Sequence, residues 1–465
     1  MADGRYWVQT LGCPKNQVDS DKLEGLLHGE GYVPAADPGE ADLLVVNTCA
    51  FIEAARQESI DAVLALADVR RPGAQLVVTG CMAERYGDEL AEALPEADLV
   101  AGFGRSLIPA APSGARGRGV PSAPVTLRPR PERSPAHRRR AEHVDSFDLL
   151  RLPRPASPAP WAYVKVAEGC DRRCGFCAIP TFRGVQRSRT PIDVLAEVRS
   201  LVSDLAMPVK EVVLVAQDLA SYGRDRTAAS HGPGPRRAVG RPTPLVSLVA
   251  EVAQLALRTR LLYLYPSGLT GELIDAVLGT GVPYFDLSLQ HVSRPLLARM
   301  RRWGDGERFV DRIDAIRAQS PLATFRSSFI LGYPGETEAD HDALLEFLAA
   351  AQLDWAGFFT FSRESGTYAD RLPDQVPAEL ALERSRECAE LQDAITARRR
   401  DALVGQVREV LVDAPGTARS VHEAPEIDGV VRVPASLAVG TVVDVMITES
   451  LGTDVAAETV ERHGS

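Results

Sequence analysis

One cysteine cluster constrains this chain more than any other feature: the spacing Cys170-x-x-x-Cys174-x-x-Cys177. Three thiolates this close in sequence can surround one metal centre, and a cubane iron–sulfur cluster held by only three cysteines keeps one iron open. A structural zinc site is the alternative, but such sites are normally closed by four protein ligands. Because no further Cys or His lies nearby in the sequence, the spacing favours a 4Fe–4S cluster whose open iron binds another molecule.

Three other cysteines are far apart in sequence but share a local context. Cys13, Cys49 and Cys81 each follow a short apolar run and precede a helical pattern. Such runs are typical of buried parallel strands, and ligands of open α/β sheets collect at the carboxyl ends of the strands. We therefore expect the three thiols to converge at one edge of a sheet, in the place where ligands collect. The alternative is that they are ordinary buried thiols at strand ends.

From residue 162 to residue 361 the sequence alternates strand patterns with helical patterns. Strands are expected at 162–167, 211–216, 260–265, 284–289, 324–331 and 355–361. Six such units predict a partial parallel (β/α)6 barrel, and Cys170, Cys174 and Cys177 follow its first strand. This places them on the C-terminal face of the barrel, where the chemistry of such folds is found.

Polar residues and glycines at other strand ends share that face, and Arg326 lies within the fifth strand. The predicted ligand-binding residues are Gln217, Asp218, Gln290, Arg326, Gly332 and Gly335. Glycine allows close approach of a ligand to the backbone, and arginine suits a carboxylate. Each residue also has a purely structural explanation, but their shared position favours one common ligand.

The sequence predicts an α/β protein that ends in a small β-barrel, and changes in composition mark the boundaries of its parts. The predicted parts are an N-terminal parallel-sheet domain at 1–104, a linker rich in Pro and Arg at 105–158, a barrel domain at 159–396 and a β-rich domain at 397–465. A second stretch rich in Gly, Pro and Arg, 224–244, reads as a surface insertion. Arg138-Arg-Arg140 in the linker reads as a solvated charge run.

The same sequence indicates where the protein works. Its 465 residues include seven cysteines, which suits a reducing compartment, and no long apolar segment is present. The formal net charge of −11 argues against a protein whose whole surface binds nucleic acid. A cytoplasmic location without a membrane span is the expectation.

Several motifs resemble those of the radical S-adenosylmethionine (SAM) methylthiotransferases. They are Leu11-Gly-Cys-Pro-Lys-Asn-Gln-Val-Asp-Ser20, Val46-Asn-Thr-Cys-Ala-Phe-Ile52, Gly80-Cys-Met-Ala-Glu-Arg-Tyr86 and the Cys170–Cys177 run. Pro14-Lys15, Phe51-Ile52, Arg363-Glu-Ser-Gly-Thr367 and Ala424-Pro-Glu-Ile-Asp-Gly429 are similar to the branch of that family that modifies a ribosomal protein. The likeness covers nearly the whole chain, and it identifies the C-terminal part as a TRAM domain of OB-like form.

The resemblance implies a mechanism and a set of cofactors. Cys170, Cys174 and Cys177 would hold the 4Fe–4S cluster that binds and cleaves SAM, and Arg326 would meet the SAM carboxylate. Cys13, Cys49 and Cys81 would hold an auxiliary 4Fe–4S cluster whose open iron carries the sulfur. One SAM methylates that sulfur and a second generates the radical that removes a hydrogen. The implied partners are a ferredoxin or flavodoxin reductant and a sulfur carrier. No catalytic residue beyond the cluster ligands is predicted.

The implied acceptor is the β-carbon of an aspartate in the small-subunit ribosomal protein uS12. In the tail after residue 397, acidic residues outnumber arginines, which suits a basic protein better than RNA. The alternatives left open are a tRNA adenosine C2 methylthiotransferase and a non-catalytic iron–sulfur protein for binding or electron transfer.

Overall fold

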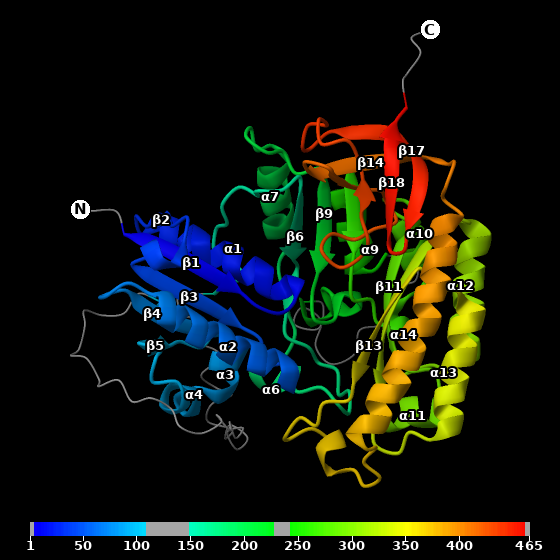
Figure 1. Cartoon of the computed structure of the whole chain (residues 1–465), viewed down its shortest axis with the longest axis horizontal. Helices are drawn as coiled ribbons and strands as arrows, with labels where there is room; N and C mark the ends of the chain where they lie inside the picture. Colours follow the sequence, from blue (N-terminus) through cyan, green and yellow to red (C-terminus); the bar gives the residue numbers. More distant parts are fainter. Residues whose placement is uncertain (1–3, 108–147, 227–241, 461–465) are drawn as a thin grey trace.

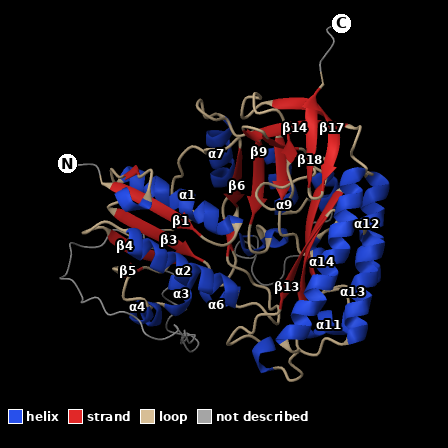
Figure 2. Ribbon diagram, viewed as in Figure 1, coloured by secondary structure: helices blue, strands red, loops and turns tan. Residues whose placement is uncertain are grey.

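The computed structural model describes residues 4–107, 148–226 and 242–460, and Figure 1 shows their arrangement. Most of the predicted linker, the central part of the 224–244 insertion and the Arg138–Arg140 run lie outside these residues. The α/β architecture with a C-terminal small barrel is confirmed (Figure 2). No helix in the described ranges is long and apolar enough to cross a membrane.

The N-terminal domain is a five-stranded parallel sheet in the order β2-β1-β3-β4-β5. Its elements are β1 (Arg5–Thr10), α1 (Pro14–Gly29), β2 (Val33–Pro34), β3 (Leu43–Thr48), α2 (Glu53–Val69), β4 (Gln75–Gly80), α3 (Cys81–Tyr86), α4 (Asp88–Ala93) and β5 (Leu99–Val100). All six residues of β3 are buried, as expected for a central strand covered on both faces. The three strands that precede the cysteines are therefore immediate neighbours.

The central domain contains six parallel strands in two sheets, β6-β9-β10 and β11-β12-β13. They are β6 (Trp161–Lys165), β9 (Glu211–Val215), β10 (Arg258–Leu261), β11 (Tyr284–Gln290), β12 (Thr324–Leu331) and β13 (Trp355–Thr360). An isolated parallel bridge between Leu264 and Leu287 joins the sheets. The third strand is shorter than expected because Tyr263 turns to a φ of +65°, which ends regular pairing there.

Helices cover the outside of this barrel (Figure 1). They are α7 (Pro191–Val202), α9 (Pro244–Ala253), α10 (Gly271–Leu278), α11 (Arg294–Arg299), α12 (Gly306–Gln319), α13 (Glu338–Ala351) and α14 (Ala378–Asp401). The short helix α6 (Ile179–Phe182) instead packs against the N-terminal domain, whose core cluster includes Phe182. The short strands β7 (Ala167–Glu168) and β8 (Arg187–Ser188) form a separate ribbon. From α7 to α13 each helix starts at a Thr, Ser or Asp whose side chain accepts a backbone N–H of the first turn.

Both neighbouring domains contribute residues to the hydrophobic cluster inside the barrel. Along β6, Val164 faces the helix-side core, whereas Tyr163 points inward, as the two-residue period of a strand requires. The inward cluster also contains Val18 of α1 and Ala424 of the C-terminal domain. The three domains thus share one hydrophobic cluster inside the barrel.

The C-terminal domain is a closed barrel in the strand order β14-β15-β16-β18-β17. Its strands are β14 (Val407–Ala414), β15 (Thr417–Arg419), β16 (Val431–Arg432), β17 (Val442–Leu451) and β18 (Asp454–Thr459). It docks on the first residues of the central strands: Arg419 pairs with Glu211 at 2.9 Å, and Trp355 Nε1 donates to the His422 carbonyl at 3.0 Å. This barrel therefore covers the amino ends of the central strands.

Candidate functional site: two cysteine triads at a domain interface

The N-terminal triad forms where three adjacent strands end. Cys13 is the N-cap of α1, Cys49 follows β3, and Cys81 is the first residue of α3. A Cβ placed on Gly12 would lie 3.0 Å from the Cys49 Sγ, so glycine lets the first loop pass close to the second cysteine. The structure brings Cys13, Cys49 and Cys81 together as the sequence predicted, since their thiols interact electrostatically with one another.

The second triad lies in the loop between β7 and α6. The Cys177 amide donates to the Cys174 carbonyl at 3.2 Å, and the Gly175 amide donates to Met300 at 2.8 Å, which fixes the loop against the barrel. The Arg172 amide lies 3.4 Å from the Cys170 Sγ, and Arg302 Nη1 lies 3.5 Å from the Cys174 Sγ. These donors are placed to stabilise thiolate charge.

Each triad supplies three free cysteine thiols, the kind of ligand that holds an iron–sulfur cluster. In the part of the chain that the structure describes, no three His, Cys, Asp or Glu side chains converge tightly enough to hold one metal ion. Each thiolate of a cubane binds a different iron, so the three sulfurs must stand farther apart than ligands of one ion. Burial raises the pKa of both Cys81 and Cys177 to about 12. Binding of iron at these positions therefore has to displace protons.

A buried ionic network connects the two triads across the domain interface. Arg183, which follows the second triad, donates to the Cys81 Sγ at 3.0 Å and to Asn16 Oδ1 at 2.6 Å. The same guanidinium meets Glu168 at 2.9 Å and Asp19 at 3.1 Å. Lys165 binds both carboxylates, at 2.7 Å from Glu168. The network puts a permanent cation beside Cys81 and locks α1 to the start of the barrel.

A second buried ion pair closes the other side of the interface. Glu364, in the loop after β13, accepts from Arg56 of α2 and from Arg85 of α3, each at 2.7 Å. Arg85 also donates to the Ala50 carbonyl at 2.8 Å, directly after Cys49. Glu364 therefore holds the N-terminal domain at the position where its cysteines face the barrel.

Lys15 points from α1 toward the barrel. Its Nζ lies 3.2 Å from the centre of the Tyr263 ring, and the residue is 9 % exposed. Burial lowers the pKa of Lys15, while the neighbouring Cys13 raises it and Arg183 lowers it further. A cation thus stands between the N-terminal triad and the interior of the barrel.

The residues predicted at the ends of the second and fourth strands lie on the C-terminal face of the barrel, which also carries the second triad. Gln217 Nε2 donates to Glu168 Oε1 at 2.8 Å, so Gln217 is part of the network that reaches Cys81. Asp218 accepts from Arg172 Nε at 2.7 Å. Gln290 has a φ of +73°, a conformation that non-glycine residues seldom adopt outside functional sites.

The other three predicted residues contact protein groups. Arg326 lies within β12, as the sequence predicted, 3.3 Å from Asp286 and 3.4 Å from Asp428. A Cβ on Gly335 would lie 1.5 Å from Arg299 Nη1, and one on Gly332 would lie 2.4 Å from the Ala381 Cβ. The close approaches that require these glycines are thus made by the protein itself, and their role toward SAM stays a prediction.

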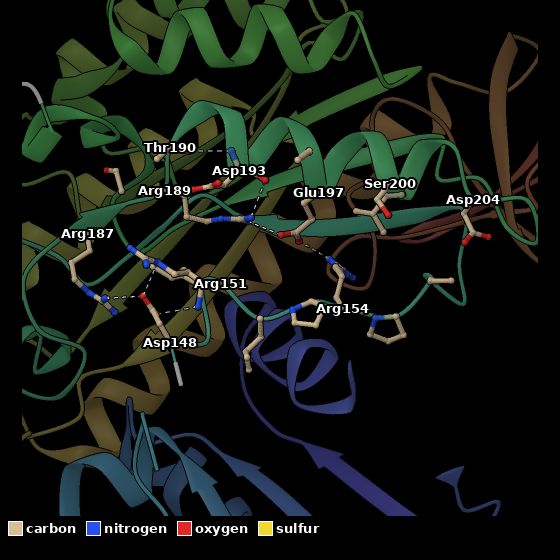
Figure 3. Close-up of a pocket in the computed structure, with 18 of the residues that line it drawn as sticks. Asp148, Arg151, Arg154, Arg187, Arg189, Thr190, Asp193, Glu197, Ser200 and Asp204 are labelled. Carbon is tan, nitrogen blue, oxygen red and sulfur yellow. Dashed lines mark hydrogen bonds and ion pairs between the residues drawn. The ribbon is translucent and has the colours of Figure 1, made fainter. Parts of the chain in front are cut away.

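One cavity among the described residues lies apart from both triads. It measures about 840 Å³ and is enclosed by residues 148–156, the segment 187–190 and α7, with no cysteine in its lining (Figure 3). Its arginines already have acidic partners: Arg189 lies 2.7 Å from Glu197, and Arg187 lies 3.2 Å from Asp148. The cavity therefore lies where residues 148–156 pack on the barrel.

Three family models match the chain in sequence order. They are the Uncharacterized protein family UPF0004 at residues 5–102, the Radical SAM superfamily at 164–348 and the TRAM domain at 404–460. The first and second contain one cysteine triad each. The predicted domains at 1–104, 159–396 and 397–465 each contain one of these matches, and their boundaries stay a prediction.

Full-length relatives decide the family. Proteins named ribosomal protein uS12 methylthiotransferase RimO from Cutibacterium acnes, Kineococcus radiotolerans and Streptomyces coelicolor are 41 %, 40 % and 39 % identical to the chain. The alignments cover 96–97 % of this chain and 95–96 % of each relative. The chain belongs to the RimO family. As a member, it is a radical SAM transferase, and its cofactors are SAM and 4Fe–4S clusters.

A solved structure agrees with the RimO-family fold. The radical SAM methyltransferase TsrM from Kitasatospora setae, solved with cobalamin and a [4Fe–4S] cluster, matches with a TM-score of 0.50. The match covers 90 % of this chain and 77 % of TsrM at 14 % identity, so it supports the fold alone.

Sequence reasoning missed the residues that hold the RimO-family interface together. Arg183 and Glu168 flank the second cysteine motif, and Glu364 lies in a motif that the sequence analysis singled out. An arginine in a sequence looks the same whether it is solvated or paired in a domain interface. The only available signal was proximity to the cysteines.

Proposed function

We propose that this chain inserts a methylthio group at the β-carbon of an aspartate of ribosomal protein uS12. The observation that carries the proposal is the pairing of two cysteine triads in two domains that a buried ionic network locks together. The shared name of the full-length relatives supplies the substrate class. A cytoplasmic location follows from a ribosomal substrate.

The triads have separate roles in this proposal. Cys170, Cys174 and Cys177 hold the cluster that binds SAM, and Cys13, Cys49 and Cys81 hold the auxiliary cluster. When bound, the two clusters and SAM supply the 5′-deoxyadenosyl radical, the sulfur and the methyl group. The residues Gln217, Asp218, Gln290, Gly332 and Gly335 are proposed to shape the SAM site. A ferredoxin or flavodoxin and a sulfur carrier are the proposed partners.

The protein's own groups position these components and control their charge. Arg183 places a fixed cation on the Cys81 sulfur, which favours the anionic thiolate as a ligand. Arg302 does the same near Cys174. Because both domains contribute to the network, a change that loosens the interface should separate SAM cleavage from sulfur transfer.

Only some of the acidic residues in the C-terminal tail are available to attract a basic protein substrate. Glu423 and Asp428 of the tail are buried and paired with Arg400 and Arg326. They cannot attract a partner. The acidic residues that remain exposed include Glu426, Glu449 and Glu458, and these support a basic partner.

Substrate choice is tested by incubating the reconstituted enzyme with SAM, sulfide and reductant, once with uS12 and once with tRNA. Mass spectrometry should find a methylthio group on the uS12 aspartate only. A methylthio group on a tRNA adenosine, with none on uS12, would refute the proposal. Absence of SAM cleavage in any mixture would favour a non-catalytic iron–sulfur protein.

Single variants test the division of labour. Cys174→Ala should abolish 5′-deoxyadenosine formation, whereas Cys49→Ala should still cleave SAM but transfer no sulfur. Changing Cys13, Cys49 and Cys81 together to Ala should remove one of two clusters, measured as iron content and absorbance. A triple variant with its full iron complement would show that the N-terminal triad does not bind a cluster.

A further inference from the structure

Lys15 differs from the other buried lysines of the chain in having no acidic partner. Lys22 is paired with Glu197 at 3.2 Å, and Lys165 is paired with both Asp19 and Glu168. Lys15, at 9 % exposure, has no hydrogen bond or ion pair to any residue within the described ranges, and its ammonium lies against the face of the Tyr263 ring. A buried ammonium without hydrogen bonds is costly, although a cation–π contact recovers part of the cost.

Asp286, the carboxylate that interacts electrostatically with this cation, already has other partners. Asp286 accepts from the Tyr263 amide at 2.9 Å and lies 3.3 Å from Arg326. The Lys15 ammonium therefore retains its hydrogen-bonding capacity for a group that arrives from outside the chain.

The backbone beneath Lys15 is also unusual. Tyr263 has a φ of +65°, which is rare for a bulky side chain and costs free energy that the surrounding structure must supply. This conformation follows the end of β10 and places the ring under the Lys15 ammonium. Lys15 is the second residue of α1, and the positive end of that helix also favours an anion nearby.

We propose that Lys15 binds the side-chain carboxylate of the substrate aspartate and makes the enzyme specific for it. The inference rests on the proposed function, because it names the group that recognises the acceptor. Lys15 is two residues from Cys13 and interacts electrostatically with Cys13 and Cys49. A carboxylate held there brings the adjacent β-carbon to the N-terminal triad. An adenine base has no carboxylate to offer, so the same contact disfavours tRNA.

The test measures binding without turnover. Anaerobic holoenzyme with SAM but no reductant is titrated with fluorescently labelled uS12 carrying either the acceptor Asp or an Asp→Asn change at that position. Wild type should bind the Asp form roughly 10- to 100-fold more tightly, the range expected for one charge-assisted hydrogen bond. Lys15→Met should remove this preference, and Lys15→Arg should restore part of it. Lys210→Met, at a lysine outside the site, is the matched control and should keep the full preference.

Comparison of the two uS12 forms on one enzyme variant separates recognition from folding. A Lys15→Met enzyme that still prefers Asp over Asn would overturn the inference, and so would equal weakening of both forms. Wild type that methylthiolates uS12 but binds both forms equally would overturn the inference and leave the proposed function standing. Wild type that never modifies uS12 would refute the proposed function itself.

Discussion

Glu364→Gln tests how the two triads are held in register. The substitution keeps the shape of the side chain but removes the charge that Arg56 and Arg85 share. All three side chains are at most 8 % exposed, so water cannot replace the lost carboxylate. Breaking a buried ion pair typically costs about 3–5 kcal/mol. Arg56 keeps Glu53 and Arg85 keeps the Ala50 carbonyl, which argues for the lower end, about 3 kcal/mol.

The cost should appear as undocking of the N-terminal domain. A change of about 3 kcal/mol corresponds to a more than hundredfold shift in an equilibrium. In native-state hydrogen exchange, the amides of α2 and α3, which carry the two arginines, should therefore exchange more than a hundredfold faster. The amides of α12 and α13 should keep their protection. The enzyme should then form 5′-deoxyadenosine in excess over methylthiolated product.

Glu53→Gln is the matched control for this prediction. Glu53 pairs with the same Arg56, but its side chain is 77 % exposed, so its loss should cost less than about 1 kcal/mol. The reasoning fails if Glu364→Gln changes exchange of α2 no more than Glu53→Gln does. It also fails if all three domains lose protection equally, because the substitution would then act on global folding.

Three further predictions concern buried charge. Burial raises the pKa of Glu211, but Arg260 and Arg419 outweigh this effect and lower the pKa to about 2. The stability that the Glu211 carboxylate contributes should therefore be lost as the pH falls from about 4.5 toward 2. Glu211→Gln should flatten that part of an acid titration followed by tryptophan fluorescence. Burial lowers the pKa of His291 to about 4, so between pH 4 and 6.5 the unfolded chain binds one proton more than the folded chain. The free energy of unfolding should therefore increase as the pH rises from 4 to 6.5. His291→Gln should remove this slope from the urea midpoints of the apoprotein. Arg326→Met leaves two carboxylates unpaired and should destabilise the protein by about 3 kcal/mol in urea unfolding, and SAM titration of the same variant tests whether Arg326 also meets SAM. A variant whose acid titration, pH slope or urea midpoint equals that of the wild type would contradict the electrostatic role assigned to that residue.

Local patterns in the sequence were sufficient to predict where the cysteines meet. Short apolar runs predict strands, and parallel strands end at one edge, so Cys13, Cys49 and Cys81 converge whatever the details of packing. The six strand–helix units and the C-terminal small barrel follow from the same periodicity. These features depend on local pattern and on rules of chain connection that hold across folds.

Tertiary structure alone decided the partners of the charged residues. Arg326, predicted to bind SAM, meets Asp428 from the C-terminal domain, about a hundred residues away in sequence. Arg183 reaches Cys81, and Lys15 is left without a carboxylate. The docking of the C-terminal barrel on the amino ends of the central strands was likewise absent from the sequence pattern. Side-chain pairing across domains depends on how whole surfaces pack, and a one-dimensional pattern of polar and apolar residues carries no information about that packing.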